Sequence, residues 1–121
     1  MTRNVALVVL DTVRKDYFDE HAPRIRAAAD VSVEGCRAAS SWSVPSHASM
    51  FTGDLPGEHG FHAEGFDADA DFSRLAGETF LAALGDHRTV GLSANSYVNG
   101  HFGFDALLDE FHDFSIGSHT A

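Results

Sequence analysis

The hydrophobic pattern of the chain is strongest near its N-terminus, where residues 5–10 form an unbroken apolar run rich in β-branched side chains. Such a run is typical of a strand buried on both faces of a parallel sheet. It ends abruptly at Asp11, so the sequence predicts a strand with a carboxylate at its carboxyl end. Residues 31–39 predict a second, weaker strand, and residues 89–93 predict another buried strand.

Helical spacing of apolar residues predicts three helices between these strands. The first follows Pro23, the second runs from near Ser43 to a stop at Gly53, and the third spans residues 78–84. The residues expected to face inward on them are Ile25, Ala28, Ala29, Val44, Ala48, Phe51, Phe80, Leu81 and Leu84. Residues 54–73 predict a polar loop, and residues 106–111 predict a short amphipathic segment.

Strands that alternate with helices indicate the α/β class. We expect a partial three-layer α/β/α arrangement around a mostly parallel sheet, with a core left incomplete at one edge. An open sheet edge favours pairing with another chain. Self-association, or pairing with a missing C-terminal part, is therefore an expected partner interaction.

The charge of the chain changes the expected partners. The net charge is -10 over 121 residues, and Lys15 is the only lysine. An acidic, lysine-poor surface is suited to a salt-rich cytoplasm, which is a hypothesis about habitat. The same charge argues against nucleic acid as a partner, because phosphate backbones bind basic patches.

The apolar run is too short for a membrane helix of roughly 18–20 residues. It is also shorter than a secretory apolar region of about 7–15 residues, so we expect a cytoplasmic protein without a membrane partner. Cys36 is the single cysteine, which excludes an internal disulfide. We expect it to be a small buried residue and not a reactive thiol.

Asp11 is the first candidate for chemistry, because open α/β sheets bind ligands at the carboxyl edge of their strands. Its carboxylate suits Ca²⁺, Mg²⁺ or Mn²⁺ and is acceptable to Zn²⁺. The alternative is that Asp11 caps a turn or the following helix.

Ser43 is the second candidate. Pro45 fits the first turn of a helix, so Ser43 lies at or just before a helix N-terminus. The positive end of the helix dipole stabilises a bound phosphate or sulfate there. A metal or base must activate a serine hydroxyl, and Asp11 would supply that metal. The alternative is that Ser43 is an ordinary N-cap.

His47 returns to the face of Ser43 one turn later, where it would stabilise charge on the transferring group. The alternative is a half-exposed histidine packed on the helix. We expect His59 to order its loop. The remaining polar candidates are expected to be a solvated acidic loop, outward-facing acids and turn residues: Asp67, Asp69, Asp71, Asp105, Asp109, Asn95 and Asn99.

Three segments in order resemble the sulfatase family within the alkaline-phosphatase superfamily. Residues 4–14 (NVALVVLDTVR) resemble its opening strand and first metal-binding aspartate. Residues 41–53 (SWSVPSHASMFTG), followed by 58–60 (EHG), are similar to its signature around the nucleophile and are the most specific match. Residues 78–80, 88–90, 102–105 and 109–111 resemble the helix, strand and aromatic turn that follow.

The resemblance implies an alkaline-phosphatase-like fold, with residues 1–121 as the N-terminal portion of a single domain whose C-terminal part is absent. It implies Asp11 as a metal ligand and Ser43 as both a metal ligand and the catalytic nucleophile; His47 is the further catalytic candidate from its helical spacing to Ser43. Ca²⁺ or Mg²⁺ is the expected metal, with Zn²⁺ or Mn²⁺ as alternatives. Ser43 stands where sulfatases carry the residue converted to formylglycine.

Two departures from the family pattern bear on the reaction. His47 replaces the arginine that ends the conversion pattern, which counts against formylglycine and favours phosphoryl transfer through Ser43. Thr12 replaces a second aspartate. The implied function is metal-dependent hydrolysis of sulfate or phosphate esters, weak or absent in this chain alone because further ligands come from later sequence.

The alternative function is a non-catalytic fragment or interaction module that retains only the fold. A dinucleotide-binding domain is excluded by the lack of a G-x-G-x-x-G after the first strand. A receiver-like domain would leave residues 43–53 unexplained.

Overall fold

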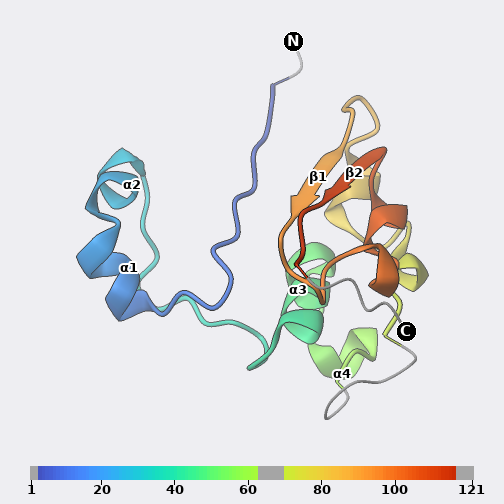
Figure 1. Ribbon diagram of the computed structural model, residues 1–121, viewed down its shortest axis with the longest axis horizontal. Helices are drawn as coiled ribbons and strands as arrows, with labels where there is room; N and C mark the ends of the chain where they lie inside the picture. Colours follow the sequence, from blue (N-terminus) through green and yellow to red (C-terminus); the bar gives the residue numbers. More distant parts are fainter. Residues whose placement is uncertain (1–2, 63–69, 117–121) are drawn as a thin grey trace. The chain divides into compact units, whose positions relative to one another are not determined.

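The structure is a computed structural model that describes residues 3–62 and 70–116 (Figure 1). Its α-helices are α1 (Lys15–His21), α2 (Pro23–Ala28), α3 (Ser43–Thr52) and α4 (Pro56–His59). Short 3₁₀ helices follow as η1 (Phe72–Leu75), η2 (Phe80–Ala83), η3 (Gly100–Phe102) and η4 (Phe104–Leu107). The strands are β1 (Val90–Ser93) and β2 (Glu110–Asp113).

The described chain divides into two compact units. One is Val5–Arg37, and the other comprises residues 3–4, 38–62 and 70–116. Each is described by itself below.

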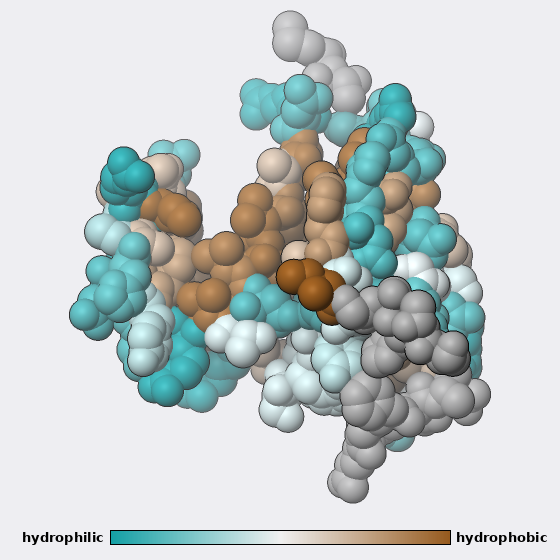
Figure 2. Space-filling model, in the orientation of Figure 1, coloured by the Kyte–Doolittle hydropathy of each residue, from teal (hydrophilic) through white to brown (hydrophobic). Residues whose placement is uncertain are grey.

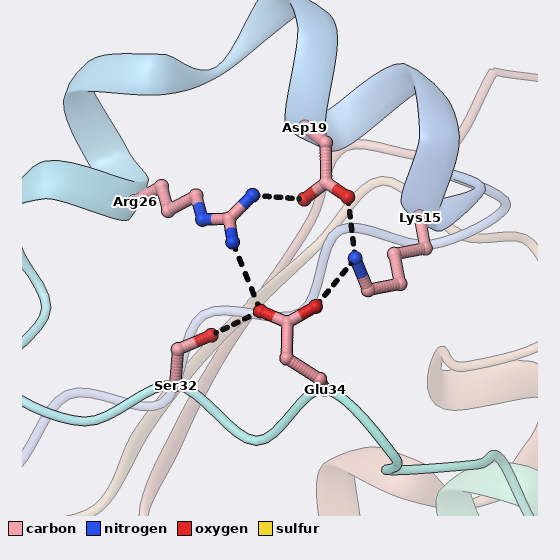
Figure 3. Close-up of polar contacts among 5 residues, drawn as sticks. All are labelled: Lys15, Asp19, Arg26, Ser32 and Glu34. Carbon is pink, nitrogen blue, oxygen red and sulfur yellow. Dashed lines mark hydrogen bonds and ion pairs between the residues drawn. The ribbon is translucent and has the colours of Figure 1, made fainter.

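The smaller unit is held together by charge. Figure 3 shows Lys15 and Arg26 alternating with Asp19 and Glu34 in one cluster of ion pairs. Arg26 lies 3.1 Å from Asp19 and 3.0 Å from Glu34, and Lys15 lies 2.7 Å from Glu34 and also contacts Asp19. Hydrogen bonds to Asp19 and then to Glu34 raise the pKa of Lys15, and the bond from Lys15 lowers the pKa of Asp19.

Helices α1 and α2 contain no buried residue. The helix predicted after Pro23 is confirmed as α2, but the inward orientation of Ile25, Ala28 and Ala29 is wrong, because all three are exposed. Exposed ion pairs are individually weak and are screened by salt. The unit therefore depends on several such pairs acting together.

The strand predicted at residues 5–10 is wrong. The segment is irregular (Figure 1), and Val8 is 76% exposed. Figure 2 shows hydrophobic residues, in brown, at the visible surface, which agrees with the exposure of apolar side chains. A buried parallel strand needs ladder partners on its edges, and among the described residues the sheet is made by β1 and β2.

Residues 31–39 also form no strand, so that prediction is wrong as well. They run through an exposed turn, closed by the N–H of Cys36 donating to the carbonyl of Val33 at 3.4 Å. Cys36 is exposed and free, which corrects its expected burial.

The core of the larger unit is built around packed aromatic rings. Phe72 is fully buried and packs edge-to-face against Phe104 at 5.1 Å and against Phe61 at 5.8 Å between ring centroids. Helix α3 adds Val44 and Ala48 to this cluster, and Phe51 packs against it. Edge-to-face pairs are favourable beyond their buried area, which lets short 3₁₀ segments hold a core.

The sheet of the described residues is parallel, with β1 beside β2 and Val90 opposite Glu110 (Figure 1). The strand predicted at residues 89–93 is confirmed as β1, but its full burial is wrong, because Leu92 is 69% exposed. The sequence did not predict β2, because its residues overlap the end of the amphipathic segment predicted at residues 106–111. The N–H of Thr89 donates to Asp109 at 2.8 Å and joins the two strand starts.

The predicted helix at residues 78–84 is the 3₁₀ helix η2, and Phe80 on it is exposed while Leu81 and Leu84 are half-buried. Helices with a parallel pair of strands are compatible with the α/β class. The three-layer arrangement stays a prediction. No helix in residues 3–62 and 70–116 is long and apolar enough to cross a membrane.

Truncating the central ring tests this description of the core. We expect Phe72→Ala to lower the free energy of unfolding by about 3–5 kcal/mol, because it removes a fully buried ring and leaves a cavity. Urea unfolding followed by circular dichroism measures the change. Ile116→Ala is the control, because Ile116 is 99% exposed and its loss should be nearly neutral. Equal effects of the two substitutions would contradict the assignment of the core.

Candidate functional site

The start of α3 is the candidate site, and local sequence explains its form. Trp42 is the N-cap with extended backbone (φ -143°, ψ 169°), Ser43 is the first helical residue, and Pro45 lies in the first turn. Gly53 ends the helix in the left-handed region (φ 83°), and its N–H donates to the carbonyl of Ser49. The helix predicted from Ser43 to a stop at Gly53 is therefore confirmed.

Ser43 is not an N-cap, so that alternative is wrong. The N-cap is Trp42, without a capping side chain. The Oγ of Ser43 instead accepts a hydrogen bond of 3.0 Å from Nδ2 of Asn95. The hydroxyl thus lies at the positive end of a helix and contacts a donor from a distant part of the chain.

Asn95 follows the end of β1 by two residues. Its Oδ1 accepts from the N–H of Tyr97 at 2.8 Å, so the predicted turn is confirmed. The contact with Ser43 was missed by sequence reasoning. The signal in the sequence that could have indicated this contact was the position of Asn95 just after a strand. The same criterion selected Asp11 as a candidate.

His47 is buried, with 7% of its surface exposed. Its Nδ1 lies 2.8 Å from the carbonyl oxygen of Ser43. Because a carbonyl only accepts, Nδ1 carries the hydrogen, and Nε2 is the acceptor of the neutral ring. The ring is thus anchored to the turn that carries Ser43, and the alternative of a half-exposed histidine is wrong. Its catalytic role stays a prediction.

His59 orders its loop, as expected. Its Nδ1 accepts from the N–H of Phe61 at 3.0 Å, so Nε2 carries the hydrogen and donates to Oγ of Ser49 at 2.8 Å. Burial lowers the pKa of His59, with nearby acids such as Asp54 opposing the shift. The bond to Ser49 ties α4 to α3.

Asp11 belongs to the smaller unit, where it is exposed in a turn. The turn contains Thr12 with φ 63°, an uncommon conformation for a β-branched residue, and the N–H of Val13 donates to the carbonyl of Leu10 at 3.4 Å. The N-cap of α1 is Arg14, so capping of that helix by Asp11 is wrong, whereas capping of the turn by Asp11 stays a prediction.

The chemistry of the predicted metal ligands is consistent with a hard cation, because the Asp11 carboxylate and the Ser43 hydroxyl both offer oxygen. Among residues 3–62 and 70–116, no group of three or more His, Cys, Asp or Glu is placed to hold a metal ion. The metal therefore stays a prediction.

The remaining polar candidates have structural roles where they are described. Asp71 caps η1 through Ser73, and the bond from the Ser73 hydroxyl lowers its pKa. Asp67 and Asp69 lie outside the described residues. Asp105 and Asp109 are exposed, and Asn99 caps η3, all as expected.

Comparison with known families gives a match over most of the chain. The family model for type I phosphodiesterases and nucleotide pyrophosphatases, within the alkaline phosphatase superfamily, matches residues 5–84. This range includes Asp11, Ser43 and His47. No curated protein and no solved structure matches the chain.

The lowered pKa of His59 predicts a pH dependence. The stability that His59 contributes should be fully present above its pKa in the unfolded chain, about 6.5. It should be lost as the pH falls through the lower pKa of the folded state. Protonation of Nδ1 would also break the bond from Phe61. We expect His59→Gln to reduce the difference in urea midpoint between pH 7.5 and pH 5. His21→Gln, at an exposed histidine, is the control, and an equal reduction there would contradict the assignment.

Proposed function

The chain belongs to the type I phosphodiesterase and nucleotide pyrophosphatase family, and from this premise we propose that it forms the N-terminal part of a metal-dependent hydrolase of phosphate esters. The observation that carries the proposal is the position of Ser43. Its hydroxyl lies at the start of α3 and accepts a hydrogen bond from Asn95. A hydroxyl so placed faces the site where a helix favours an anion.

In the proposed reaction, Oγ of Ser43 attacks phosphorus and forms an O–P bond as the bond to the leaving oxygen breaks. The serine proton passes to solvent, and the leaving oxygen takes a proton from water. Water then hydrolyses the phosphoserine and restores the hydroxyl. The first turn of α3 stabilises the negative charge of the bound group.

Asp11 and Ser43 are the proposed ligands of a divalent cation, with Ca²⁺ or Mg²⁺ favoured and Zn²⁺ or Mn²⁺ as alternatives. When bound, such an ion supplies positive charge beside the reacting oxygens. Further donors would come from outside the described residues. The 121-residue chain by itself is therefore expected to hydrolyse esters weakly.

His47 is proposed to assist at the same helix turn. Its bond to the carbonyl of Ser43 fixes the ring beside the nucleophile. From there the ring would stabilise charge on the transferring group.

A sulfate ester is the second candidate substrate, favoured by the resemblance of residues 41–53 to the sulfatase signature. Parallel assays with p-nitrophenyl sulfate and bis(p-nitrophenyl) phosphate separate the two. Intact mass reports conversion of Ser43 to formylglycine as a loss of about two mass units, from two hydrogens. A non-catalytic role of the same fold is the alternative to both.

Removal of the nucleophile tests the reaction. We expect Ser43→Ala to abolish metal-dependent hydrolysis of bis(p-nitrophenyl) phosphate in the protein that carries this chain, because no O–P bond can form at alanine. Ser32→Ala is the control and should retain the wild-type rate, because Ser32 contacts Glu34 in the ion-pair cluster. Turnover by Ser43→Ala would remove the mechanism.

Removal of the carboxylate charge tests the metal. Asp11→Asn should weaken binding of Ca²⁺ or Mn²⁺ by about tenfold or more, because an amide oxygen is a weaker ligand than a carboxylate. Isothermal titration calorimetry measures the affinity. Asp16→Asn, which removes an exposed carboxylate paired with Arg14, is the matched control. Unchanged affinity in Asp11→Asn would exclude Asp11 as a ligand.

A further inference from the structure

The contact between Asn95 and Ser43 joins two segments that are 52 residues apart in sequence. Ser43 opens α3, and Asn95 lies just beyond the carboxyl end of β1. Both side chains are half-buried, where a hydrogen bond is less exposed to competition from water. The contact therefore has a defined geometry and is not a surface encounter.

The backbone fixes which end of the Asn95 amide faces the serine. Oδ1 accepts from the N–H of Tyr97 at 2.8 Å, which only an oxygen can do. The NH₂ group is therefore the end directed at Oγ of Ser43. A second turn contact, from the N–H of Asn95 to Oγ of Ser93 at 3.1 Å, holds the residue itself.

We propose that Asn95 is a positioning residue for the nucleophile, an inference that rests on the proposed function. By donating to Oγ, Asn95 holds the Ser43 hydroxyl in one orientation at the helix start. It also stabilises the negative charge that develops on Oγ as the proton leaves, because hydrogen bonds to charged oxygens are stronger than those to neutral ones.

The alternative is that the bond between Asn95 and Ser43 only attaches the loop to α3, and this role leads to different expected results. Loss of such a tie would lower stability without changing how the rate depends on pH. Loss of a donor to a developing alkoxide would lower kcat and leave KM nearly unchanged. The pH at which the rate begins to increase would also move upward. The pH profile is thus the readout that separates the two roles.

The test compares three variants in the protein that carries this chain, with bis(p-nitrophenyl) phosphate as the probe. Asn95→Ala removes both the turn and the donor. Asn95→Ser keeps a hydroxyl that can form the turn but is too short to reach Ser43. Asn99→Ala is the matched control, because Asn99 forms the same kind of turn with His101 at 3.0 Å.

We expect both Asn95 variants to lower kcat by about 10- to 100-fold, the range for a lost hydrogen bond to a charged group. Their pH profiles should move to higher pH, while Asn99→Ala keeps the wild-type profile even if its melting temperature falls. Wild-type kcat and pH profile in Asn95→Ser would overturn the positioning role. Turnover in Ser43→Ala, or none in the wild-type protein, would instead overturn the proposed function.

A measurement without turnover checks the contact itself. The side-chain amide resonances of Asn95 should shift in Ser43→Ala, because the acceptor of its NH₂ group is lost. Resonances that stay in place would show that the donor does not face Ser43 and would overturn the inference.

Discussion

The packing of one face of α3 against buried aromatic rings is the constraint on which the larger unit depends. Val44 and Ala48 on that face join the cluster centred on Phe72 and Phe104. Because a helix is rigid along its length, burial of this face also fixes the direction of its first turn. The position of Ser43 is therefore a consequence of core packing, and Asn95 reaches it from the end of β1 across the same unit.

The helix start could be predicted because its signals are local. Pro45, the spacing of apolar residues and Gly53 act within one segment, and the structure places them as expected. The strand predicted at residues 5–10 failed for the opposite reason. An apolar run indicates that burial is favourable, but a strand forms only where another strand completes its hydrogen bonds.

The candidate site shows the same division between local and distant information. Sequence identified Ser43 and His47 because a helical turn relates them, and a 2.8 Å contact joins the two residues. Sequence assigned Asn95 only a turn, since nothing local connects it with a residue 52 positions away. The family match adds to this geometry, because the matched family is that of type I phosphodiesterases and nucleotide pyrophosphatases, whereas the sequence left sulfate and phosphate esters open.

The ion-pair cluster of the smaller unit has a practical consequence. Lys15 is the only lysine of the chain, and its hydrogen bonds to Asp19 and then Glu34 raise the pKa of its amine, so the unprotonated amine is rarer here than in a lysine without acidic partners. A protonated amine does not react with acylating reagents. Acylation at Lys15 should therefore become faster when these ion pairs are broken, so its reactivity reports whether the cluster is intact.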